Sequence, residues 1–154
     1  MRQAVVAGSV AVAGLNLLAA GVGAAVWYRG AVDGAGARSF WLLLRVAQGS
    51  ALTLAVAVGS LAAAGHTPRE GLFYLYALLP LAVGFVAEQL RVASAQTVLD
   101  QRGLDDASAV GRLPAAEQRA VVSSILHRET GVMTLSALVV VFLALRAAGT
   151  AHGF

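Results

Sequence analysis

The chain has 154 residues, of which 58% are hydrophobic and only 12% are charged, and its mean hydropathy is +0.76. An average soluble domain has roughly 25% charged residues. A soluble fold of this length also could not bury several separate apolar runs of about 20 residues each. The composition therefore predicts a protein that lives in the lipid bilayer.

The ionisable residues narrow the classes of function. The formal net charge of +3 comes wholly from arginine, because the sequence has no lysine. A basic excess on so apolar a chain indicates membrane orientation rather than nucleic-acid binding, because no soluble domain is left on which to build a binding face. The absence of cysteine excludes disulfides, thiolate metal sites, iron–sulfur clusters and cysteine nucleophiles.

The first apolar run covers residues 4–28, which is long enough to cross a bilayer. A secretory signal peptide is the alternative interpretation, because Arg2 precedes the run and small residues occur near Ala24. The run exceeds the usual signal-peptide core of roughly 7 to 15 residues and has almost no basic region before it. We therefore predict a transmembrane helix.

A glycine-containing linker at residues 29–38 leads to the second apolar run, and the third run follows a sharp helix-start signal. Thr67 is predicted to be the N-cap, with Pro68 at the first helical position and Glu70 completing a capping box. Pro80, inside the third run, predicts a local kink or a lost backbone hydrogen bond.

The third helix is expected to leave the lipid and continue into water, because residues 88–101 are polar and contain no helix breaker. Gly103 is predicted to end it. Residues 104–113 indicate a brief surface helix or an ordered loop, and Pro114 should begin the last helix.

Together these segments predict an all-α, polytopic membrane protein in which residues 1–154 form a single transmembrane domain. We expect an antiparallel bundle of four helices, the last two extended into a cytoplasmic helical hairpin at about residues 88–129. The expected spans are residues 4–28, 40–64, 70–90 and 129–149.

The arginines predict the orientation. One side of the membrane would carry Arg29, Arg38, Arg45, Arg91, Arg102, Arg112, Arg119 and Arg128. The opposite side would carry only Arg2, Arg69 and Arg146. Because the arginine-rich side stays in the cytoplasm, we expect a multi-pass protein of the cell membrane with both termini on the extracytoplasmic side.

Helices in lipid associate through close packing of small residues, and two faces have the required spacing. On the second span they are Gly49, Thr53, Ala57, Ser60 and Ala64. On the first span they are Ala7, Ala11, Gly14, Gly21 and Ala25. We predict that these faces pack, although an alanine-rich chain also places small residues on any face by chance.

The small-residue face of the second span carries a charge when it is extended toward the cytoplasm. Arg45 lies four residues before Gly49, and Glu88 shares a helix face with Gly84 at similar depth. An unpaired charge deep in a bilayer costs roughly 2.5 to 3.5 kcal/mol, so we expect pairing. The expected intramembrane polar cluster is Arg45, Gln48, Glu88, Arg91, His127 and Glu129. The sequence does not say whether the face with His127 or the face with Glu129 looks inward.

The sequence predicts no cofactor and no metal. A b-type haem needs two axial ligands at matching depth, and His127 is the only histidine on the cytoplasmic side, so a haem site would need two copies of the chain. Quinone binding beside His127 and Glu129 is a further alternative without a specific motif. Ser123 can reach His127 one turn away, but a serine and a histidine on one helix face are common and do not by themselves indicate hydrolytic catalysis.

The polar cluster has two interpretations. Intramembrane Glu, His and Arg side chains suggest a proton or ion relay, whereas interfacial salt bridges with snorkelling arginines are structural. Polar residues in the outer half are sparse, which favours the structural interpretation. We therefore expect a non-enzymatic accessory, assembly or scaffold subunit, in a homo-oligomer or a larger membrane complex. The alternatives are a small proton-coupled transporter or ion-conducting oligomer using Glu88 and Arg45, and a quinone-associated redox anchor.

Overall fold

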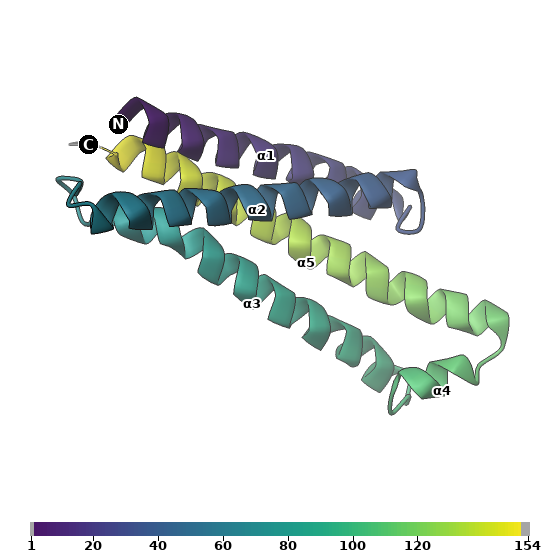
Figure 1. The fold of residues 1–154 in the computed structure, drawn as a ribbon. Helices are drawn as coiled ribbons and strands as arrows, with labels where there is room; N and C mark the ends of the chain where they lie inside the picture. Colours follow the sequence, from purple (N-terminus) through teal and green to yellow (C-terminus); the bar gives the residue numbers. More distant parts are fainter. Residues whose placement is uncertain (1, 152–154) are drawn as a thin grey trace.

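The computed structural model describes residues 2–151, and every regular element in that range is an α-helix (Figure 1). The helices are α1 (Arg2–Arg29), α2 (Ala35–Ala63), α3 (Leu72–Gln101), α4 (Ala107–Gly111) and α5 (Ala115–Thr150). Four of them, all except α4, are long and apolar enough to cross a membrane. The predicted all-helical fold with four membrane helices is thus confirmed.

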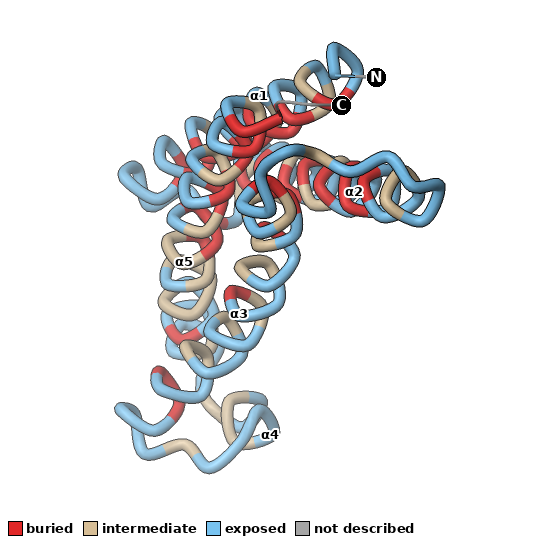
Figure 2. The backbone as a smooth tube through the Cα atoms, turned by 90° about the vertical axis from the view of Figure 1, so that its left-hand side faces the viewer, coloured by how far each residue is buried: buried red, intermediate tan, exposed pale blue. Residues whose placement is uncertain are grey.

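The last helix has the most extensive packing. α5 packs along both α1 and α3, α2 packs along α1, and the interface between α2 and α3 is much smaller than these. The start of α1, the end of α5 and the α2–α3 connection lie at one end of the molecule, opposite α4 (Figure 1). Toward α4, α3 and α5 diverge from α1 and α2 (Figures 1 and 2).

The predicted packing faces of α1 and α2 were wrong for both helices. All ten residues that were predicted to pack are exposed. The buried residues of α1 are Val5, Ser9, Val12, Ala13, Asn16, Ala19, Ala20, Gly23 and Val26. Those of α2 are Ala37, Phe40, Leu44, Ala47, Ala51, Leu54, Ala55 and Val58. These faces combine small residues with large apolar ones. Large side chains fill the space that small residues leave on the neighbouring helix, so such faces gain more dispersion contacts than faces of small residues alone.

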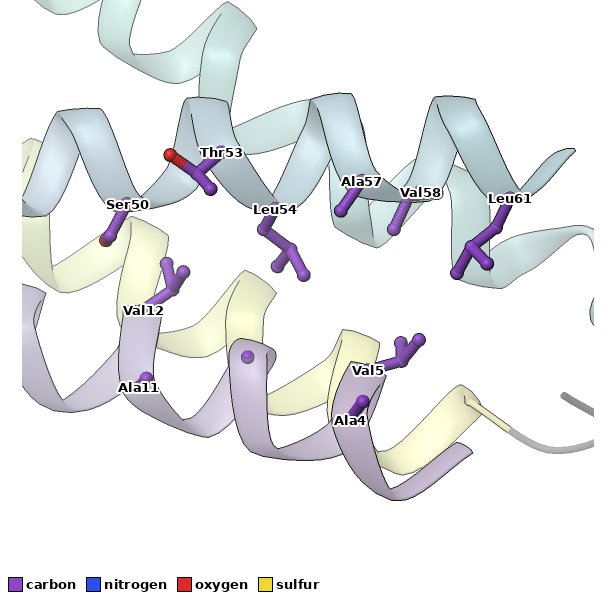
Figure 3. A pocket seen from close by; sticks show the side chains of 11 residues that line it. Ala4, Val5, Ala11, Val12, Ser50, Thr53, Leu54, Ala57, Val58 and Leu61 are labelled. Carbon is purple, nitrogen blue, oxygen red and sulfur yellow. The ribbon is translucent and has the colours of Figure 1, made fainter. Parts of the chain in front are cut away.

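Part of the predicted face of α2 borders a groove instead of a helix contact. Thr53 and Ala57 of α2 lie across from Ala11 of α1 at an apolar groove of about 480 Å³ between these helices (Figure 3). Its other lining residues are mostly apolar. The two helices are therefore separated along this part of the predicted face.

The predicted capping box at the start of the third helix was wrong. α3 begins at Leu72, its N-cap is Gly71, and no side chain caps it. Residues 66–70 form the connection instead. These residues join the neighbouring ends of α2 and α3, which diverge only toward α4 (Figure 1). α3 continues without interruption through Pro80.

The other predicted ends agree with the structure. Gly103 has a φ of +65°, and the Leu104 N–H donates to the carbonyl of Leu99 at 3.0 Å, which closes the end of α3. Asp106 caps the short helix α4 by accepting from the Ala109 N–H. Pro114 immediately precedes α5.

Candidate functional site

An ion pair between α2 and α3 forms the centre of the polar cluster. Arg45 Nη1 donates to Glu88 Oε1 at 2.8 Å and to Gln48 Oε1 at 2.8 Å. Gln48 Nε2 in turn donates to the same Glu88 oxygen at 3.5 Å. Arg45 and Gln48 share a face because they are three residues apart on one helix. The network joins two helices that otherwise share little contact.

Arg91 connects this pair to the last helix. Its Nε lies 2.9 Å from Glu88 Oε2, and its Nη1 lies 3.9 Å from Glu129 Oε2. The guanidinium also lies over the ring of Trp41, 5.6 Å from the centroid, in a cation–π contact. Arg91 therefore touches groups from α2, α3 and α5.

His127, the remaining residue of the predicted cluster, lies elsewhere. Its ring stacks on Trp27 of α1, with centroids 5.5 Å apart and an interplanar angle of 20°. Two residues along a helix correspond to about 200° of rotation, so His127 and Glu129 project from opposite sides of α5. The structure thus brings five of the six residues together and separates His127 from them.

The four charged residues of the cluster form a chain in which positive and negative side chains alternate: Arg45, Glu88, Arg91 and Glu129. Side-chain exposure is greatest at Arg45, at 53%, and least at Glu129, at 16%. Within residues 2–151, no donor hydrogen-bonds to Glu129, whose one ionic partner is the distant Arg91. Glu129 is therefore the least neutralised member.

A cavity of about 280 Å³ borders the cluster between α2, α3 and α5. Arg45, Gln48 and Glu88 line one end of it, and most of its wall is apolar. Asn16 and Ser136 add two polar groups deeper in the wall. The Asn16 side chain is 2% exposed and donates to the Val12 carbonyl. Polar side chains therefore extend further from the cluster than their sparse distribution in the sequence indicates.

Two tryptophans of this region were missed as site residues. Trp27 packs against His127 and Gly131, where an added Cβ would lie 3.0 Å from Trp27 Nε1. Trp41 lies under Arg91. The signal for Trp41 was its position one helical turn before Arg45. No local signal pairs Trp27 with His127, because their contact is between separate helices.

The side chains of the cluster determine which chemistry the arrangement can support. No group of three or more His, Cys, Asp or Glu side chains in the described part of the chain is placed to hold a metal ion. Charge pairing, hydrogen bonding and proton exchange at a carboxylate are what these side chains can provide.

Four long apolar helices and a charged layer between them define a multi-pass α-helical membrane protein. The chain matches no model of a known protein family, no curated protein and no solved structure.

Proposed function

We propose that the protein is a non-enzymatic accessory, assembly or scaffold subunit of a membrane complex. The observation that carries this proposal is the alternation of charge from Arg45 through Glu88 and Arg91 to Glu129. Each charge has an opposite neighbour, and the network joins α2, α3 and α5. Such a layer is suited to fixing the positions of helices, because breaking a pair would leave a charge without compensation in a medium of low dielectric.

The segment around α4 supports the same role. Val98 and Leu99 at the end of α3 pack with Val121 of α5 in a small apolar cluster of their own, against which residues from α4 and its flanks also pack. The Arg128 guanidinium of α5 donates to the Gln101 side chain of α3 at 3.2 Å. This hydrogen bond also joins the two helices. We propose that this end of the molecule is the cytoplasmic hairpin and presents an ordered polar surface to a partner.

A second candidate function is proton-coupled transport, and Glu129 is the observation that favours it. Its side chain is 16% exposed, and it has only a long contact with Arg91. A carboxyl group that is mostly buried and weakly paired can load and release a proton at less cost than one bound by two arginines. Glu129 therefore fits this role better than Glu88, which is bound to both Arg45 and Arg91.

Proton flux into liposomes that contain the purified protein separates the two functions. We expect no flux above that of empty vesicles under an imposed pH gradient, an electrical gradient or both. The controls are Glu88→Gln and Glu129→Gln, which keep the side-chain shape and remove the titratable group. Flux that Glu129→Gln abolishes would overturn the scaffold proposal and establish the transporter. Native gels of mildly solubilised membranes provide the complementary test, since a scaffold should migrate in a complex larger than the 15.7 kDa chain.

A further inference from the structure

The cavity beside the charged cluster is elongated along the helices. Its α2 wall runs from Leu44 to Leu52, and its α3 wall runs from Pro80 to Glu88. At a rise of 1.5 Å per residue these walls are about 10 to 12 Å long. The charged side chains lie at one end, and apolar ones continue toward the other. A ligand that fits must have a polar head and an apolar tail.

The cavity opens between α2 and α3. Leu52 and Phe85, which line it from these two helices, are 53% and 67% exposed. The interface between these two helices is also much smaller than those of α1 with α5, α3 with α5 and α1 with α2. In a membrane this opening faces lipid, so an acyl chain can enter from the side without crossing the protein.

Arg45 has donors to spare at the charged end. Both of its hydrogen bonds leave from Nη1, whereas a guanidinium carries five N–H donors. No residue in the range 2–151 accepts from its Nε or Nη2, and the side chain is 53% exposed. A guanidinium with free N–H groups favours phosphate, which it can bind through two parallel hydrogen bonds.

The depth of Arg45 matches the headgroup region. Trp41 lies one turn nearer the α1–α2 connection, and tryptophan is enriched at the level of lipid headgroups. One turn corresponds to about 5.4 Å, a distance that a long arginine side chain covers by snorkelling. Glu88 and Gln48 hold the Nη1 side of the guanidinium in place, which lowers the entropy that a bound phosphate would cost.

We propose that this cavity binds an anionic phospholipid. The phosphate accepts hydrogen bonds from the free N–H groups of Arg45, and one acyl chain fills the apolar part of the cavity between α2 and α3. The lipid covers the gap that the small α2–α3 interface leaves. A free phosphate would leave the apolar wall uncovered, so the acyl chain contributes to binding.

Lipid titration of the purified full chain, followed by native mass spectrometry, tests the proposal. The probes are phosphatidylglycerol, phosphatidylcholine with the same acyl chains, and inorganic phosphate. Both lipids carry the phosphate, but the choline cation of phosphatidylcholine cancels its negative charge and repels Arg45, so we expect phosphatidylglycerol to bind roughly tenfold more tightly. Inorganic phosphate should neither bind nor compete. Equal affinity for the two lipids, or competition by inorganic phosphate at the concentration of the lipid, would overturn the proposal.

A matched pair of glycine variants tests the position of the acyl chain. Gly84 lines the cavity, Gly49 does not, and a Cβ at either would meet no atom within 4 Å. Gly84→Leu should therefore fill the cavity and weaken phosphatidylglycerol binding roughly tenfold or more, whereas Gly49→Leu should leave it unchanged. Arg45→Gln should reduce the affinity for phosphatidylglycerol to that for phosphatidylcholine. Equal binding by Gly84→Leu and Gly49→Leu would place the lipid elsewhere.

Discussion

At the scale of single residues, Gly23 occupies the tightest of the described glycine positions. It lies on α1 where the Phe40 ring from α2 and the Thr134 hydroxyl from α5 converge. A Cβ at this position would lie 2.5 Å from the Phe40 ring and would also collide with Thr134. Three helices can approach here because one residue lacks a side chain, in agreement with the role of small residues in membrane helix packing.

Gly23→Ala should therefore destabilise the fold by about 1 to 3 kcal/mol, the usual cost of overpacking a filled core. Gly21→Ala is the matched control, because a Cβ there meets nothing within 4 Å. We expect it to leave stability unchanged or raise it by up to about 1 kcal/mol through better helix propensity. Thermal unfolding in detergent measures both, and equal midpoints for the two variants would contradict the assigned packing.

The Arg45–Glu88 pair predicts an energetic coupling. Replacing either residue with methionine should destabilise the protein by leaving the other charge less well compensated, whereas replacing both should cost less than the sum. We expect a coupling of about 0.5 to 1 kcal/mol, near the lower end for contacting residues, because water reaches the half-exposed Arg45. Strict additivity in a double-mutant cycle of unfolding free energies would show that the two side chains are not partners.

At the scale of elements, α5 has two buried faces rather than one. Thr134 faces α1, where it approaches Gly23. Met133 belongs to a buried cluster with Ala87 of α3, and Glu129 lies near Arg91, which also belongs to α3. A helix packed between two partners buries residues over a wide arc. The face with Thr134 and the face with Met133 and Glu129 therefore both look inward.

The cap of α4 predicts a pH dependence at the end of the molecule. The Ser108 hydroxyl donates to the Asp106 carboxylate at 2.6 Å and the Ala109 N–H donates to it at 2.9 Å, and these bonds hold the pKa of Asp106 below its ordinary value of 3.8. A carboxyl group with a lowered pKa stabilises the folded state above its unfolded pKa, and this contribution disappears as the pH falls through the folded value.

Protection of the Ala109 amide from hydrogen exchange, corrected for the intrinsic rate, should therefore fall between about pH 5 and about pH 3. Asp106→Asn is the control, because asparagine caps a helix about as well as aspartate and does not titrate in this range. Its protection should be independent of pH. A parallel loss in both proteins would assign the effect to another group.

At the scale of the whole molecule, orientation in the membrane stays a prediction. The sequence has no cysteine, so single cysteines can be introduced without a background. We expect cysteines at Ala35 and Ser108 to be shielded from an impermeant thiol reagent in intact cells. A cysteine at Thr67, an exposed residue of the opposite connection, should react. The reverse pattern would invert the proposed topology and place the charged layer at the outer interface.

By itself the sequence determined the elements of this protein. Runs of about 20 apolar residues predict membrane helices because lipid requires every backbone polar group to be satisfied within the segment. Gly103 and Pro114 mark helix ends through their own backbone restrictions. The sequence also predicts that Arg45 pairs with Glu88, because both charges fall at similar depth. In the structure Arg45 Nη1 lies 2.8 Å from Glu88 Oε1.

Only the tertiary structure decided which faces meet. α1 and α2 carry small residues on several sides, so spacing alone could not separate the packed face from the exposed one, and the contact followed the larger side chains of Phe40 and Leu44. His127 likewise lies apart from the charged cluster because α5 has a partner on each side. These choices depend on how the side chains of separate helices complement each other in shape, which is a property of pairs of surfaces and not of any one segment.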